Sequence, residues 1–136
     1  ADDGGNGYEL WMHDIITGVT QMVVNFNPSG NGYANYITIL GSTIYFEAYD
    51  SNFGLELRAY EITNDTAWLV SDSRSGPGSG YANEIQLISS NLYFVSDDGI
   101  SGFELWQFNT TNQTASRLTD INPGLGDGNP DNSLQR

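Results

Sequence analysis

The chain has 136 residues, with four arginines and no lysine against 17 carboxylates. Its net charge of −13 argues against nucleic acids and anionic membrane surfaces as partners. It has no cysteine, which excludes disulfide bonds, thiolate zinc sites and cysteine nucleophiles. No apolar run reaches the roughly 18 residues that a membrane-spanning segment needs, so we expect no membrane insertion. A hydrophobic content of 38% at this length is enough for one folded domain.

Short runs of β-branched and aromatic residues, separated by Gly, Ser, Asn and Asp, predict ten strands. In chain order these runs cover residues 8–13, 20–26, 36–40, 43–49, 55–62, 66–72, 84–89, 91–96, 103–109 and 114–121. Tight hairpin turns are expected at residues 41–42, 64–65, 89–90 and 111–112. No segment of ten or more residues shows helical periodicity. The chain is therefore expected to be all-β.

One sequence pattern recurs along the whole chain. The tetrapeptide Gly-x-Glu-Leu starts at residues 7, 54 and 102, so its copies are 47 and 48 residues apart. Gly-Tyr-Ala-Asn at residues 32–35 returns at 80–83, and Tyr-Phe at 45–46 returns at 93–94. A fixed period of this length indicates an array of one supersecondary unit.

We expect this array to be a single domain, residues 1–136, with units at roughly 1–47, 48–95 and 96–136. Four strands in 40–50 residues are typical of a β-propeller blade, so each unit is predicted to be a blade of four antiparallel strands. The third unit is incomplete, because it lacks a counterpart of the strands at 36–40 and 43–49. We therefore expect a fragment of a larger propeller-like protein, or a protomer that assembles with copies of itself or with neighbouring blades.

The repeats resemble a known family. Residues 104–111 read Glu-Leu-Trp-Gln-Phe-Asn-Thr-Thr, residues 118–124 read Leu-Thr-Asp-Ile-Asn-Pro-Gly, and residues 9–14 read Glu-Leu-Trp-Met-His-Asp. They resemble the ELWxxDGT repeat, a unit of roughly 48 residues in large bacterial surface or secreted proteins, whose repeats look like propeller blades. The Asp-Gly-Thr part departs from the pattern, with Asp-Ile-Ile at 14–16 and Asn-Thr-Thr at 109–111. The resemblance implies an extracellular or cell-surface scaffold more than a defined chemistry.

Catalysis has little support in the sequence. His13 is the only histidine, so a Ser-His-Asp arrangement would depend on it. A partly exposed strand residue is the simpler interpretation, and no pair of carboxylates stands out for glycoside hydrolysis. We therefore nominate no catalytic residue and expect a noncatalytic protein. A hydrolase on the same scaffold is the enzymatic alternative.

Calcium is the one cofactor that the residue types suggest. Three Gly-rich turns hold carboxylate and amide oxygens, the hard ligands that Ca²⁺ prefers. The candidate ligands are Asp2, Asp3, Asn6, Asp50, Asn52, Asp97 and Asp98. A further acidic group near the C-terminus comprises Asp120, Asp127, Asn129 and Asp131. The alternative is that these are ordinary turn residues whose side chains bond their own backbone.

The aromatic residues suggest a second kind of site. Trp11 and Trp106 follow two Glu-Leu copies, and Tyr33 and Tyr81 occupy equivalent positions 48 residues apart. Sugars stack on exposed aromatic faces, and repeated shallow sites would add avidity, as in a carbohydrate-binding propeller lectin. The alternative is that the tryptophans fill the space between blades.

The most constant polar positions are Glu9, Glu56 and Glu104, for which a structural bond to the adjacent blade is expected. The overall expectation is a noncatalytic extracellular repeat module with a structural or adhesive role. The carbohydrate-binding lectin is the alternative.

Overall fold

The computed structural model describes residues 1–121 and residue 123. These residues form ten β-strands in three antiparallel sheets, and no described residue lies in an α-helix. The all-β prediction is therefore confirmed. Within the same residues there is no helix of the length and apolarity required to cross a membrane.

Each of the ten predicted runs overlaps one strand of the structure. The strands are β1 (Leu10–His13), β2 (Thr20–Val24), β3 (Asn35–Leu40), β4 (Thr43–Asp50), β5 (Gly54–Glu61), β6 (Thr66–Ser71), β7 (Asn83–Ile88), β8 (Asn91–Asp97), β9 (Phe103–Asn109) and β10 (Thr114–Arg117). The clearest difference is at β10, which was expected to continue to residue 121. It ends at Arg117 because Thr119 and Ile121 turn to bond the side chain of Glu104.

The grouping of strands into sheets differs from the predicted units. The first sheet holds only β1 and β2, the middle sheet has the order β3-β4-β5-β6, and the last sheet has the order β10-β9-β8-β7. The prediction that the strands at 8–13, 20–26, 36–40 and 43–49 form one sheet was therefore wrong. The first two of them form the first sheet, and the other two belong to the middle sheet. A repeat period gives the spacing of equivalent strands but not which neighbours pair. Among the described residues the first sheet has two strands, and the last has four.

The backbone repeats as closely as the sequence does. Non-glycine residues with positive φ occur in pairs 48 residues apart: Tyr33 and Tyr81, Tyr36 and Glu84, Asp65 and Gln113. The pairing register also shifts at matching places in β3–β4 and β7–β8, after Asn35 and after Asn83. A β-bulge of this kind bends a strand and twists it locally. Each four-stranded sheet therefore bends in the same way beside its neighbour.

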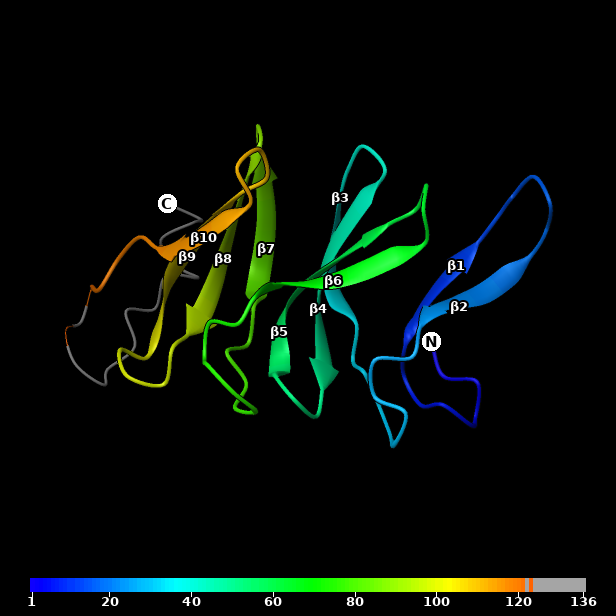
Figure 1. Cartoon of the computed structure of the whole chain (residues 1–136), viewed down its shortest axis with the longest axis horizontal. Helices are drawn as coiled ribbons and strands as arrows, with labels where there is room; N and C mark the ends of the chain where they lie inside the picture. Colours follow the sequence, from blue (N-terminus) through cyan, green and yellow to red (C-terminus); the bar gives the residue numbers. More distant parts are fainter. Residues whose placement is uncertain (122, 124–136) are drawn as a thin grey trace.

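The three sheets lie side by side (Figure 1), and two apolar layers of side chains hold them together. The first apolar layer joins the first and middle sheets and contains Leu10, Val23, Val24, Phe26, Ala34, Ile44, Phe46, Ala48 and Tyr60. The second joins the middle and last sheets and contains Leu40, Tyr45, Leu57, Ala59, Trp68, Val70, Ala82, Ile85, Leu87, Leu92, Phe94, Trp106, Phe108 and Ala115. Adjacent residues of a strand point to opposite faces, so Tyr45 and Phe46 enter different layers. The middle sheet thus buries both of its faces.

A first prediction concerns Gly80, which lies in the loop between the middle and last sheets. A Cβ atom there would lie 2.4 Å from Glu56 Oε1, too close for any real contact. We expect Gly80→Ala to destabilise the chain by about 1–3 kcal/mol, the usual cost of overpacking. Urea unfolding followed by tryptophan fluorescence measures the change.

The matched control is Gly5→Ala, where the new Cβ would meet only Asp3 Oδ1 at an ordinary 3.7 Å. This variant should unfold at nearly the wild-type urea concentration. Equal effects of the two substitutions would show that the contact with Glu56 is not what restricts residue 80.

Candidate functional site

The three glutamates of the Gly-x-Glu-Leu motif are buried. Their exposed fractions are 2% for Glu9, 0% for Glu56 and 0% for Glu104. The motif glycines before them adopt positive φ values of +76°, +71° and +74° at residues 7, 54 and 102, which favour glycine. The motif leucine packs in an apolar layer in the first two copies. The glycine and the glutamate of every copy, and the leucine of the first two, therefore have a structural reason to recur.

Each glutamate binds the chain where it leaves the outermost strand of the same sheet. The bonds to the carboxylates are from the N–H groups of Phe26 and Asn27 to Glu9 (both 3.3 Å), from those of Ser73 and Arg74 to Glu56 (2.9 and 3.1 Å), and from Thr119 Oγ1 and the Ile121 N–H to Glu104 (3.0 and 3.1 Å). A buried carboxylate needs such donors, because unpaired burial of a charge is costly. The three carboxylates thus fix the loops that lead out of their sheets.

A glycine closes each complete junction beside the carboxylate. Gly32 donates its N–H to the Tyr8 carbonyl (2.9 Å) and accepts from the Tyr49 N–H (2.6 Å), so it links the first and middle sheets. Gly80 links the middle and last sheets in the same way, through the Leu55 carbonyl (3.1 Å) and the Asp97 N–H (2.7 Å). The glutamate site therefore also sets the distance between neighbouring sheets.

Burial raises the pKa of Glu9, and the N–H donors from Phe26, Asn27 and Gly32 partly oppose that rise. Burial and, to a smaller extent, the charge of Asp72 raise the pKa of Glu56 to about 7, again against backbone donors. These shifts follow from the structural environment of the carboxylates.

The residue after the motif preserves one hydrogen bond despite its change of type. The indole Nε1 of Trp11 donates to the Ala1 carbonyl at 3.0 Å, and Trp106 Nε1 donates to the Ser96 carbonyl at 3.0 Å. In the middle copy Arg58 Nε donates to the equivalent Ala48 carbonyl at 3.3 Å. Arginine can replace tryptophan here because the guanidinium and the indole are both flat groups that carry an N–H donor.

Arg58 makes two further contacts that tryptophan would not. It forms an ion pair with Asp50, and its guanidinium lies 5.4 Å from the ring centroid of Phe26. Arg58 is 6% exposed, so it is a buried cation with a carboxylate and an aromatic face around it. Phe26 belongs to the first apolar layer, so Arg58 also connects the first and middle sheets.

The predicted calcium ligands lie in three separate turns and cap them. Asp2 accepts an N–H from Gly4, Asp3 accepts from Gly5 and Asn6, Asp50 accepts from Asn52 and Phe53, Asp97 accepts from Gly99, and Asp98 accepts from Ile100 and Ser101. Such bonds account for the aspartates at these positions without a metal. Over residues 1–121 and 123 no three acidic, histidine or cysteine side chains are grouped to hold a metal ion. Calcium binding stays a prediction.

The acidic group near the C-terminus is only partly visible. Asp120 lies 3.7 Å from Arg117 in an ion pair. Asp127, Asn129 and Asp131 lie outside the described residues.

The four predicted sugar-stacking residues divide into two pairs. Trp11 and Trp106 are half-buried, and Trp106 stacks on Phe94 with ring centroids 6.3 Å apart. Tyr33 and Tyr81 are 48% and 41% exposed. The exposed tyrosines lie at equivalent positions of different sheets, so the structure does not bring the four residues into one site.

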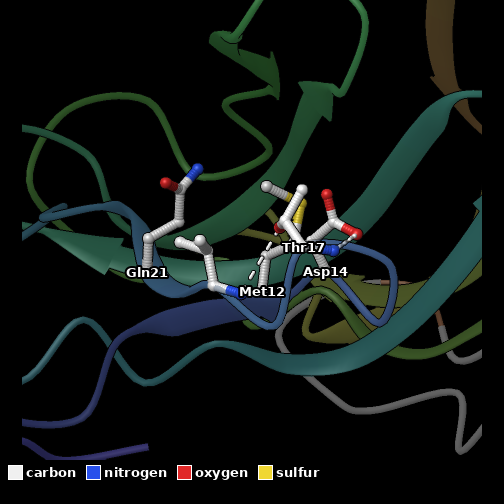
Figure 2. A pocket seen from close by; sticks show the side chains of 5 residues that line it. Met12, Asp14, Thr17 and Gln21 are labelled. Carbon is white, nitrogen blue, oxygen red and sulfur yellow. Dashed lines mark hydrogen bonds between the residues drawn. The ribbon is translucent and has the colours of Figure 1, made fainter.

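The β1–β2 hairpin holds the hollow shown in Figure 2, with a volume of about 240 Å³. It is lined by Met12, Asp14, Thr17, Val19 and Gln21. Asp14 accepts the N–H groups of Ile16 and Thr17, which lower its pKa, so this carboxylate caps the hairpin turn. His13 is exposed, and its Nδ1 lies 2.7 Å from Thr20 Oγ1. This hollow has no nucleophile paired with a base.

Sequence reasoning missed Glu47, the most unusual buried group. It is 3% exposed, and its Oε2 has no hydrogen-bond partner. Burial and, to a smaller extent, the charge of Glu56 together raise its pKa to about 7, against a bond from the Asn35 side chain. Its counterpart one repeat later is the buried Val95. A carboxylate aligned with valine inside an apolar strand was the signal that could have revealed it.

A scan against protein-family models finds no match for the chain, and no curated protein is significantly similar to it in sequence.

Glu47 leads to a prediction about pH. Folding raises the pKa of Glu47 from 4.5 to about 7, so the folded protein favours the protonated carboxyl. The resulting contribution to stability is fully present below about pH 4.5, and it is lost as the pH rises through about 7. A rise of this size corresponds to about 3 kcal/mol. Glu47→Val should therefore raise the free energy of unfolding at pH 8 by up to about 3 kcal/mol, with little change at pH 4.

Urea titrations at pH 4, 6 and 8 test this expectation. Glu47→Gln serves as the matched variant, because it keeps the side-chain shape and removes the ionisable group. If both variants lose stability between pH 4 and pH 8 as steeply as the wild type, Glu47 is not the group that titrates.

Arg58 leads to a second prediction. Arg58→Leu removes the donor to the Ala48 carbonyl and leaves Asp50 without its ion-pair partner, so we expect a loss of about 3 kcal/mol in the free energy of unfolding. Arg58→Trp, which copies residues 11 and 106, should lose clearly less because the indole N–H can replace the first bond. A tryptophan variant as unstable as the leucine variant would contradict the shared role of the three donors.

Proposed function

We propose that the chain is a noncatalytic repeat module with a structural or adhesive role, built of sheets that serve as propeller-type blades. One observation carries the proposal: the repeated polar side chains are used inside the protein. Glu9, Glu56 and Glu104 bind backbone groups, and the donors that follow them bind strand carbonyls. A catalytic or ligand-binding array would instead direct its recurrent polar groups toward a cleft.

The blade interpretation is supported by the strand order. In both four-stranded sheets the strands pair in chain order, and β6, the fourth strand of the middle sheet, leads to β7, the first strand of the last sheet. Strands β3 and β7 contact each other, so the first strands of adjacent sheets lie side by side. Radial repetition of four-stranded sheets is the architecture of a propeller.

An extracellular or cell-surface location is part of the proposal. It is supported by the resemblance to the ELWxxDGT repeats of bacterial surface proteins and by the net charge of −13, which suits a soluble, exposed protein. The partners we propose are neighbouring blades or other copies of the chain. Calcium bound at the Asp-rich turns is the accessory ligand of this proposal. Comparing the melting temperature with chelator and with excess calcium tests it, because a bound ion stabilises the folded chain.

A carbohydrate-binding lectin is the second candidate, and the exposed tyrosines favour it. Tyr33 and Tyr81 present 48% and 41% of their surface at equivalent positions, which would give two matching stacking platforms. Glycans are the ligands that this alternative implies.

A glycan array with the labelled chain distinguishes the two candidates. A scaffold should give a flat array and no hydrolysis of simple glycoside or ester substrates. A lectin should bind a defined sugar, lose at least ten-fold in affinity in Tyr33→Ala or Tyr81→Ala, and be competed by the free sugar. Glycan binding that both tyrosine variants abolish would replace the scaffold proposal by the lectin.

A further inference from the structure

Strand β3 exposes apolar side chains that its counterpart β7 buries. Ile37 and Ile39 are 54% and 56% exposed, whereas the equivalent Ile85 and Leu87 pack in the second apolar layer. Ile39 is directly opposite Ile44 in the β3–β4 pair, and Ile44 faces the first sheet. Opposite residues of an antiparallel pair share a face, so Ile39 also faces the first sheet, as does Ile37 two residues earlier.

The second junction shows what covers these positions. There the β3–β4 hairpin of the middle sheet contributes Leu40 and Tyr45 to the layer that contains Ile85 and Leu87. The first sheet has only β1 and β2, the equivalents of β5 and β6, and no hairpin at this place among the described residues. Ile37 and Ile39 are exposed because no hairpin of the described residues covers them at this junction.

The first two residues mark where the second strand of such a hairpin would end. Asp2 forms an antiparallel β-bridge with Tyr8. The equivalent pairs in the next two repeats are Tyr49 with Leu55 and Asp97 with Phe103, so the register is the same. The Ala1 carbonyl accepts from the Glu9 N–H at 2.9 Å and from Trp11 Nε1 at 3.0 Å. Ala1 therefore has the bonding position of Ala48, whose carbonyl accepts from Arg58.

The long edge of β1 is open beyond this point. Leu10–His13 pair with β2 along one edge, and within the described residues only Ala1 and Asp2 adjoin the motif on the other. An unpaired edge beside an apolar face is the arrangement that accepts an added strand, through main-chain hydrogen bonds and side-chain packing together.

We propose that the edge of β1 and the face formed by Ile37 and Ile39 are an acceptor site for a two-stranded antiparallel hairpin of the same repeat. The occupant has the chemistry of residues 33–47, with apolar side chains at the positions of Leu40 and Tyr45. Its second strand adds antiparallel to β1, in the register that the Asp2–Tyr8 bridge sets. The inference rests on the repeat array of the proposed function and not on its adhesive or carbohydrate-binding role.

The test uses the whole chain and a labelled synthetic peptide of residues 33–47, acetylated at its N-terminus and amidated at its C-terminus. Fluorescence anisotropy should show saturable binding, and calorimetry should give one peptide per chain. A peptide with the same composition in scrambled order should not bind. No saturable binding of the ordered peptide up to millimolar concentration would overturn the proposal.

Variants of the chain locate the site. Ile37→Asp and Ile39→Asp should each weaken peptide binding at least ten-fold, because they place a charge on the covered face. Ile88→Asp is the matched control, because Ile88 is a 57% exposed isoleucine on β7. It should bind the peptide as the wild type does, and melting temperatures of all three variants show whether each has folded.

Sedimentation velocity of the chain alone tests whether a second copy of the chain covers this face instead of a hairpin. A dimer that Ile37→Asp converts to monomer would show that a second copy covers this face, and would overturn the hairpin proposal. Equal peptide binding by the β3 variants and the wild type would overturn it as well. Neither result depends on the glycan array, so the failure of this inference and that of the proposed function are distinguishable.

Discussion

The fold depends on a carboxylate buried where two sheets meet. Glu56 holds the chain as it leaves β6 through the N–H groups of Ser73 and Arg74, and Gly80 packs directly on the same carboxylate. Because Gly80 also bonds Leu55 and Asp97, one side chain determines both the path of the loop and the spacing of the sheets. A buried carboxylate is tolerable only with such donors, so glutamate, glycine and loop must be retained together.

This dependence explains which features of the motif vary. The position after Glu-Leu requires an N–H donor next to a strand carbonyl, and either an indole or a guanidinium provides it. Arg58 is therefore a substitution that preserves the junction, with an added ion pair to Asp50. Glu47 is different, because the equivalent position of the next repeat is the buried, apolar Val95. The structure gives it no stabilising partner beyond the bond from Asn35.

The sequence was sufficient to predict the ten strands and their period, because alternating apolar residues and turn residues are local signals. It was insufficient to predict which strands share a sheet. The link from β4 to β5 is a tight turn capped by Asp50, whereas the link from β2 to β3 crosses between sheets, and both are Gly- and Asn-rich in sequence. The burial of Glu9, Glu56 and Glu104 could not be predicted from the sequence either. The backbone N–H groups that bind these carboxylates are about 17 residues away along the chain.

A stack of sheets is least stable where a sheet has a neighbour on one side only. The first sheet is the extreme case, because a two-stranded sheet alone is marginal in water. Its cohesion comes from the first apolar layer, from Glu9 binding the loop after β2, and from Gly32 bonding Tyr8 and Tyr49. Glu9 sits in this least supported sheet, and its raised pKa shows that its donors only partly offset burial. An added strand along the open edge of β1 would therefore contribute most to the sheet that holds Glu9.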